Sequence, residues 1–244
     1  MPTDMAFVTM SLARTPDEGE LLVRALRRLA LHGRPIFVTD GGSPADVVAA
    51  LGQIAGLTLI PQPHRAGLVG QVHTSVSAAL STPVSWLVYT EPDKLGFFEH
   101  GVGAFLNAAS QDPATSVTLA ARSADAFETF PPVQRQHEDA INTLTGAAVG
   151  VSGDFSYGPF AMPASLATLV SELDADVGWG WRHYMFAAAA RRGYGVRLHE
   201  GPFACPPDQG EEDDHERAHR LRQFTQNRRG LELALRGSEP GNGS

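Results

Sequence analysis

Short apolar runs alternate with amphipathic stretches along the first part of the chain. Runs rich in β-branched and aromatic side chains predict strands at residues 6–12, 35–39, 57–60 and 84–89. Apolar positions at i, i+3 and i+4 spacing predict helices between them, at residues 16–31, 43–55 and 71–80. Strands that alternate with helices in this way form a mostly parallel sheet with right-handed crossovers. The pattern therefore predicts an α/β fold in which helices flank a mostly parallel central sheet.

The second part of the chain is less regular. It predicts strands at residues 116–121, 145–152 and 195–199, and helices at residues 95–110, 166–173 and 179–192. Residues 127–142 have no assigned form. Acid, proline and glycine in residues 206–216 are typical of a mobile loop. The pattern also predicts a basic amphipathic helix at residues 217–235 and a disordered tail at residues 238–244.

Composition narrows the class of function. The chain has 244 residues, 43% of them hydrophobic, which is enough for a buried core. A formal net charge of −8 argues against broad electrostatic attraction to nucleic acid or to an anionic membrane. A protein that acts on small molecules is therefore a better expectation than one that binds nucleic acid or membranes.

Cysteine usage and targeting signals bear on the compartment. Cys205 is the single cysteine, so no internal disulfide demands an oxidising environment. The chain shows neither a signal peptide nor an apolar segment of the roughly 20 residues that a membrane span needs. We expect a cytoplasmic protein with no integral membrane segment.

Carboxylates stand at the ends of two predicted strands. Asp40 follows one strand and is part of the turn Thr39-Asp40-Gly41-Gly42-Ser43, whereas Glu91-Pro92-Asp93 follows another. Open α/β sheets bind ligands at the carboxyl ends of their strands, and Pro92 stiffens the backbone that holds its two acidic neighbours. A hard cation such as Mg²⁺ or Mn²⁺ uses one or two carboxylates together with substrate phosphates. The two acids therefore point to a nucleotide-sugar with a divalent metal.

These motifs resemble the GT-A glycosyltransferases, notably family 2-like enzymes and the synthases of mannosylglycerate and glucosyl-phosphoglycerate. That group carries Asp-Asp-Gly-Ser after its second strand and Asp-x-Asp after its fourth, in the positions of residues 39–43 and 91–93. The resemblance covers residues 6–201, with Thr39 and Glu91 each in place of an acid. It implies a single GT-A-like domain over residues 1–237, with a nucleotide-sugar-binding half at about 6–94 and an acceptor-binding half at about 95–205.

The resemblance also implies which residues hold the donor. Thr9 and Ser11 at the end of the first strand, together with Asp40, Arg65 and Asp93, would line the nucleotide-sugar. Read from the residues alone, Thr9 and Ser11 are equally ordinary strand-end polar groups, and Arg65 is equally a solvated surface arginine.

The metal site is implied in the same way. Glu91, Asp93 and His199 would bind Mn²⁺ or Mg²⁺, because similar synthases place a histidine after a late strand on the metal. His183 and His137 are weaker candidates. No His-x-x-x-His or Cys-x-x-Cys spacing indicates a zinc site.

An acidic and aromatic stretch precedes the helix predicted at residues 179–192. By resemblance, Asp176 or Asp174 would be the catalytic base, and Trp179 or Trp181 would stack on the acceptor. The alternatives are a helix cap for the acids and a place in the core for the indoles.

The sequence thus predicts a metal-dependent hexosyltransferase that uses a UDP- or GDP-sugar and a small hydroxyl acceptor, and that is compatible with a homodimer. A sugar-phosphate nucleotidyltransferase is the first alternative, although no glycine-rich loop follows the first strand. A nonenzymatic nucleotide-sugar-binding protein is the second.

Overall fold

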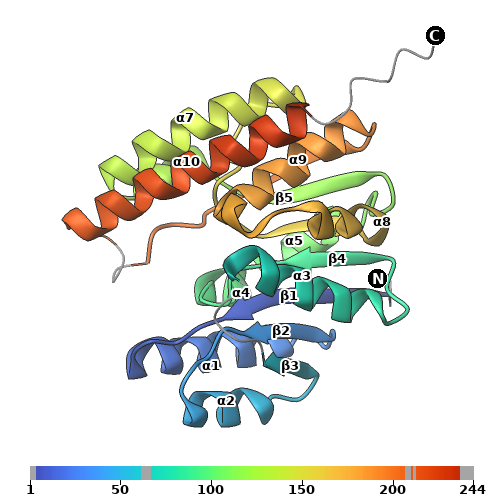
Figure 1. Cartoon of the computed structure of the whole chain (residues 1–244), viewed down its shortest axis with the longest axis vertical. Coiled ribbons are helices and arrows are strands. Elements are labelled where there is room, and N and C mark those ends of the chain that lie inside the picture. Colours follow the sequence, from blue (N-terminus) through green and yellow to red (C-terminus); the bar gives the residue numbers. More distant parts are fainter. Residues whose placement is uncertain (1–3, 62–66, 207–209, 211–212, 237–244) are drawn as a thin grey trace.

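A seven-stranded mixed sheet with helices on both faces forms the centre of the computed structural model, which describes residues 4–61, 67–206, 210 and 213–236 (Figure 1). The strands are β1 (Met5–Ser11), β2 (Ile36–Asp40), β3 (Leu57–Pro61), β4 (Trp86–Tyr89), β5 (Ser116–Arg122), β6 (Phe160–Pro163) and β7 (Gly195–Gly201). They lie in the order β3-β2-β1-β4-β6-β5-β7. Strand β6 is antiparallel to both of its neighbours and the other pairings are parallel, so the mostly parallel sheet is confirmed.

Alternating side chains of the strands divide the core between the two faces of the sheet. Phe7 and Val88 pack on one face with α1 (Pro16–Ala30), α2 (Ala45–Gly52), α4 (Leu95–His100) and α5 (Val102–Ala109). Val8 and Tyr89 pack on the other face. That second face is covered by α3 (Gly67–Leu80), α7 (Pro132–Val149), α8 (Ala164–Ala167), the 3₁₀ segments η2 (Thr168–Glu172) and η3 (Ala175–Gly180), α9 (Trp181–Arg191) and α10 (Asp214–Arg236). A short helix, α6 (Ala124–Glu128), follows β5.

Residues 145–152, predicted as a strand, instead contain the last part of α7, so that prediction is wrong. Helix α7 begins with Pro132 at its first position, a place where the missing N–H of proline is harmless. Its buried residues include Ile141 and Thr145, which are one helical turn apart. Gly150 ends the helix in the left-handed conformation, with φ of 75°. The β-branched residues of this stretch favoured a strand, but their spacing buries one helical face.

Two further differences concern the middle of the chain. Residues 95–110 form α4 and α5 instead of one helix, and they meet at Gly101, where a Cβ atom would lie 2.5 Å from the ring of Phe203. Strand β6 was not among the predicted strands; it has only four residues and includes Pro163, so its local pattern is weak. Both features depend on contacts with distant residues.

Helix α10 crosses η3 at a point where two glycines meet. A Cβ atom on Gly230 would lie 1.9 Å from the carbonyl oxygen of Gly180, and a Cβ atom on Gly180 would lie 1.9 Å from the carbonyl oxygen of Gln226. Only glycine allows this backbone approach. The crossing fixes α10 against the rest of the fold. No helix in the described part of the chain has the length and apolar content needed to cross a membrane.

Candidate functional site

A cavity of about 830 Å³ opens at the carboxyl ends of β1 and β4. One side, which we call the strand wall, is formed by the ends of these strands and the starts of α1 and α3 (residues 10–12, 14, 18, 21, 22, 67, 68, 71 and 91–94). The other side, the helix wall, is formed by α7, α10 and the segments beside them (residues 122, 130, 131, 134, 137, 138, 141, 156, 157, 179, 182, 216, 219, 220, 223, 224 and 227). The cavity therefore lies where an α/β sheet binds ligands.

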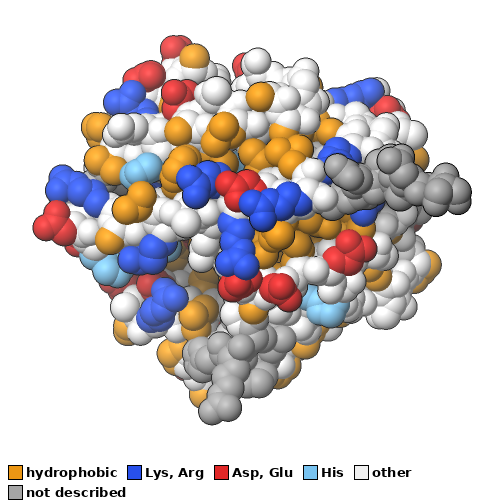
Figure 2. All heavy atoms as spheres, turned by 45° about the horizontal axis from the view of Figure 1, so that its top comes forward, with side chains coloured by type: hydrophobic (Ala, Val, Ile, Leu, Met, Phe, Trp, Pro, Cys, Tyr) orange, Lys and Arg blue, Asp and Glu red, His pale blue; other side chains and the backbone are white. Residues whose placement is uncertain are grey.

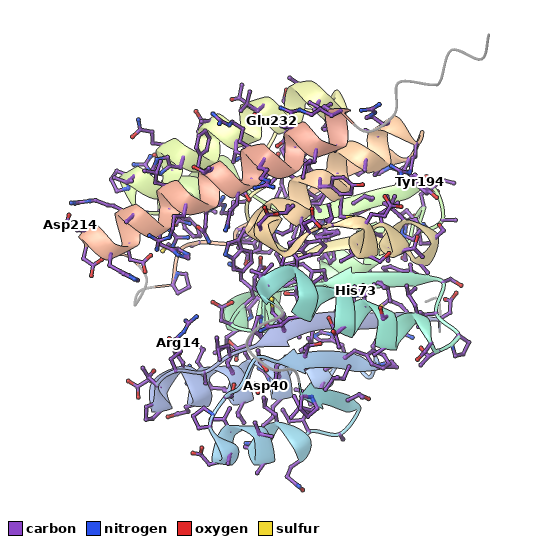
Figure 3. All side chains as sticks on the ribbon, viewed as in Figure 1. Arg14, Asp40, His73, Tyr194, Asp214 and Glu232 are labelled. Carbon is purple, nitrogen blue, oxygen red and sulfur yellow. The ribbon has the colours of Figure 1, made fainter. Side chains whose placement is uncertain are left out.

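The strand wall presents charged groups that are not used by the fold. Asp93 and Lys94 follow β4, and within the described residues neither side chain has a hydrogen bond or ion pair. The Lys94 ammonium lies 4.8 Å above the ring of Tyr157. Arg14 points from the start of α1 into the space below α10 (Figure 3), and its guanidinium too lacks an ion-pair partner among the residues that the structure describes. Two cations and one carboxylate are therefore available to a ligand.

Glu91, by contrast, is engaged by the fold. Its Oε1 accepts a hydrogen bond of 2.7 Å from the Arg182 guanidinium, and the two residues are only 8% and 6% exposed. Its other oxygen, Oε2, is enclosed against Gly158, where a Cβ atom would lie 2.0 Å away. Gly158 also has φ of 126°, which favours glycine. Glu91 is thus held by Arg182 through Oε1, while its buried Oε2 has no hydrogen-bond partner among the described residues.

The predicted three-ligand metal set does not form. His199 lies within β7, where its ring faces Phe105 at 6.2 Å, and it does not line the cavity. No group of three His, Cys, Asp or Glu side chains suited to a metal occurs in the described ranges. Asp93 remains, and one carboxylate with substrate phosphates satisfies a hard divalent cation. Asp93 and a bound diphosphate would therefore be enough to hold a metal in this cavity, and a contribution from Glu91 stays a prediction.

The other histidine candidates have different surroundings. His183 is fully buried, and burial followed by the charge of Arg182 lowers its pKa to about 3. Its Nδ1 lies 2.8 Å from the Thr145 hydroxyl. It is therefore a neutral core residue. His137 lines the cavity, and its Nδ1 is buried without a hydrogen-bond partner among the described residues.

Asp40 is used by its own turn instead of facing the cavity. Its carboxylate accepts hydrogen bonds from the backbone of Gly42 and Ser43 at 2.9 Å each, and from the hydroxyls of Ser11 and Ser43 at 2.9 and 2.5 Å. Ser11 lines the cavity, whereas Thr9 is fully buried and bonds the Met10 carbonyl. The structure thus places Ser11, but neither Thr9 nor Asp40, at the predicted donor site.

Arg65 lies outside the described residues. The α3 segment that follows it contributes Gln71 to the strand wall, with the Gln71 amide packed against Gly41. No local pattern singles out this glutamine, because its position depends on how α3 packs on β1 and β2.

The two tryptophans have opposite environments. Trp179 is half-buried and lines the cavity, with the guanidinium of Arg182 5.3 Å above its ring. Trp181 has no exposed surface and packs edge-on against Tyr89. The prediction that Trp181 contacts an acceptor is therefore wrong, because this indole is core.

The two predicted bases lie outside the cavity. Asp176 is exposed at the start of η3, where it pairs with Arg229 of α10 at 2.6 Å. Asp174 is exposed at the N-cap of η3. Gly178, near them, is in close contact with Gln226 of α10, so this glycine accommodates a helix and not a ligand. Both acids belong to the outer surface, which contradicts their assignment to the site.

Sequence reasoning missed the charge network at the base of the helix wall. Arg122 donates to Asp154 from Nε at 2.7 Å and from a terminal nitrogen at 2.9 Å, and to Glu138 at 2.7 Å. Its guanidinium lies 4.4 Å above the ring of Phe130. Burial raises the pKa of Asp154, but the hydrogen bonds and charge of Arg122 outweigh this and hold that pKa below its ordinary value. Burial lowers the pKa of Arg122, but the charges and hydrogen bonds of Glu138 and Asp154 outweigh this and raise it. The local sign of this network in the sequence was Arg122, which directly follows the apolar strand predicted at residues 116–121.

Helix α10 supplies the outer part of the helix wall. Glu216, Arg220, Gln223 and Asn227 come from its first turns and line the cavity. On the outer side of the helix, basic side chains lie beside acidic ones (Figure 2), in agreement with the ion pairs of Glu232 with arginines one turn away on either side. The sequence pattern of a basic amphipathic helix did not predict that one face lines the site.

No protein-family model and no curated protein sequence matches the chain. Solved structures do match. Mycobacterium tuberculosis glucosyl-3-phosphoglycerate synthase has a TM-score of 0.65 and 11% identity, over 93% of this chain and 80% of that one. The mannosyltransferase PcManGT from Pyrobaculum calidifontis, in complex with GDP-Man and Mn²⁺, has a TM-score of 0.68 and 14% identity, over 97% of this chain and 65% of that one. The M. tuberculosis synthase in complex with Mn²⁺, UDP and phosphoglyceric acid has a TM-score of 0.65 and 11% identity, over 97% of this chain and 80% of that one. The chain therefore has the GT-A fold of these glycosyltransferases.

Proposed function

We propose that this protein is a glycosyltransferase that moves a sugar from a nucleoside-diphosphate-sugar to a hydroxyl acceptor. The observation that carries the proposal is the set of available charges on the strand wall, where Asp93, Lys94 and Arg14 face a cavity large enough for a nucleotide-sugar. The mannosyltransferase with the same fold was solved with GDP-Man and Mn²⁺, and the synthase with UDP and Mn²⁺.

Asp93 is the residue that would hold a Mn²⁺ or Mg²⁺ ion. A divalent metal at this position supplies electrostatic stabilisation to the diphosphate as it leaves. Lys94 and Arg14 act in the same sense, because their charges are not neutralised by the fold and a diphosphate leaving group gains negative charge.

The remaining residues bind and orient. Trp179 offers its ring to one face of the acceptor, and Arg182 is held in place by Glu91. Asp174 and Asp176 take no part, since neither lines the cavity.

The experiment is a thermal-shift panel of UDP- and GDP-sugars with and without Mn²⁺, followed by measurement of nucleoside-diphosphate release. A ligand that binds only the folded state raises the melting temperature, and about 100 times its Kd adds about 2.7 kcal/mol of stability. We expect one donor class to stabilise the protein in a Mn²⁺-dependent way and to be turned over. Stabilisation without turnover would indicate a nonenzymatic binding protein, and pyrophosphate release from a nucleoside triphosphate would indicate a nucleotidyltransferase.

A further inference from the structure

The arginines of the helix wall are all paired with carboxylates. Arg122 is bonded to Asp154 and Glu138, and Arg182 is bonded to Glu91. Arg220 lies 3.7 Å from the carboxylate of Glu216, and it donates to Gln223 at 3.0 Å. The charge of each of these arginines is therefore already balanced, in contrast to the unpaired Arg14 and Lys94 of the strand wall.

The helix wall also contains two histidines, His137 and His219. Burial, followed by the positive charge of Arg220, lowers the pKa of His219 below its ordinary value, so this imidazole is neutral at neutral pH. The buried Nδ1 of His137 has no partner in the described part of the chain. Such a group can exchange a hydrogen bond with a ligand hydroxyl.

What the helix wall offers a ligand is amides and aromatic faces. Asn227 is 7% exposed and lines the cavity, and its Oδ1 is buried with no hydrogen-bond partner among the described residues. A buried polar atom without a partner is costly unless a ligand or water satisfies it. Gln223 lies one turn before it, and the rings of Trp179 and Phe224 line the same cavity. Amide groups bind hydroxyls, and aromatic rings cover the apolar face of a sugar.

A phosphate or carboxylate placed against this wall would be poorly stabilised. It would lose its hydration, and it would meet the carboxylates of Glu138 and Glu216 with no unpaired cation among the described residues of this wall to compensate. A hydroxyl has no such cost, since it needs only donors and acceptors of hydrogen bonds.

We infer that the acceptor of this protein is an uncharged sugar or polyol, bound between Trp179 and the Asn227 face of α10, and not a phosphorylated or carboxylated acid. The inference rests on the proposed function and specifies its acceptor. It separates this protein from the synthase of the same fold, whose structure holds phosphoglyceric acid.

The test uses matched acceptors on the full chain with the donor that it turns over. Glucose is compared with glucose 6-phosphate, and glycerol with 3-phosphoglycerate, by the rate of nucleoside-diphosphate release above donor hydrolysis. In every pair of which either member is used, we expect the neutral acceptor to be used at least about tenfold better than its anionic counterpart, the scale of one desolvated charge. The inference is overturned if 3-phosphoglycerate or glucose 6-phosphate equals or exceeds its neutral partner, or if no neutral acceptor raises the rate. If the protein neither binds nor turns over any nucleotide-sugar, that result contradicts the proposed function, and it is thereby distinguished from a failure of the acceptor inference alone.

A variant that removes one carboxylate of the helix wall tests whether the pairing of Arg220 disfavours anionic acceptors. Glu216→Gln releases Arg220 from its carboxylate, and we expect it to raise use of the anionic acceptors about two- to fivefold, as one partly exposed charge can do. Glu232→Gln is the matched control, because Glu232 pairs with arginines of the same helix outside the cavity (Figure 3). Equal behaviour of the two variants would contradict the role assigned to the paired arginine.

Discussion

The two walls of the cavity use charge in opposite ways. On the strand wall, Asp93, Lys94 and Arg14 have no charged partner among the described residues and are available to a ligand. On the helix wall, Arg122 and Arg182 are buried and each is committed to carboxylates. Charged groups near a site are therefore not equivalent. Those paired within the fold maintain the shape of the cavity, and the unpaired ones determine which part of a ligand lies against them.

Removing charge from the buried network of the helix wall should have the largest effect. Asp154→Asn leaves the Arg122 guanidinium buried with Glu138 as its remaining partner. We expect a loss of about 3–5 kcal/mol in the free energy of unfolding, measured by urea denaturation, because removing one partner of a buried ion pair is strongly unfavourable. Asp112→Asn is the control, since Asp112 pairs with Arg197 at the surface. A small loss at Asp154, similar to that of the control, would contradict the role of the network.

The ion pair between Arg122 and Asp154 should also make the free energy of unfolding depend on pH. The pKa of Asp154 lies below its ordinary value, so its contribution to stability is present above about pH 4 and is lost as pH falls through the lowered pKa. Unfolding free energies measured from about pH 7 down to about pH 3 should show the difference between wild type and Asp154→Asn narrowing at the acid end.

The strand wall is tested by Asp93→Asn, which removes the unpaired carboxylate without changing its size. We expect kcat/KM for the donor to fall by about 10²–10³, equivalent to roughly 3–4 kcal/mol, with loss of Mn²⁺-dependent donor binding by calorimetry. Unfolding should change little. Asp139→Asn is the control, as this exposed residue lies on α7 outside the cavity. Unchanged metal-dependent binding would exclude Asp93 as the ligand.

The attachment of the helix wall is tested at the glycine crossing. Gly230→Ala places a Cβ atom 1.9 Å from the Gly180 carbonyl oxygen, so α10 must move. We expect a destabilisation of about 1–3 kcal/mol by urea denaturation, together with a higher acceptor KM. Gly103→Ala in α5 has no atom within 4 Å of the added Cβ atom and should not destabilise the protein. Equal stability of the two variants would argue against a fixed crossing.

The smallest effect is expected at an acid that belongs to neither wall. Asp176 is exposed and pairs with Arg229, so Asp176→Asn should change stability by no more than about 0.5–1 kcal/mol and leave turnover within about twofold of wild type. Steady-state kinetics with saturating donor is the measurement. A large fall in kcat would restore Asp176 as a base, and would require η3 to move toward the cavity.

Local sequence patterns were enough to predict much of the fold and the position of Asp93 at the cavity. The apolar runs of the first four strands fix their order along the chain, and parallel strands place their carboxyl ends at one edge of the sheet. Asp93 was identified for that reason. The same logic failed at Asp40, because a sequence shows that a carboxylate follows a strand but not that its own turn will occupy it with four hydrogen bonds.

By itself, the sequence determined the alternation of strands and helices and the acidic end of β4, since both depend on residues close together in the chain. Only the tertiary structure decided that Glu91 would be paired with Arg182, 91 residues away, that Trp181 would be core while Trp179 lines the cavity, and that Asp176 would face solvent. The physical reason is that periodicity assigns a side chain to a face of its own element. Whether that face meets a partner, a core or a cavity depends on how α7, α9 and α10 pack on one another and on η3, and local periodicity does not specify this packing.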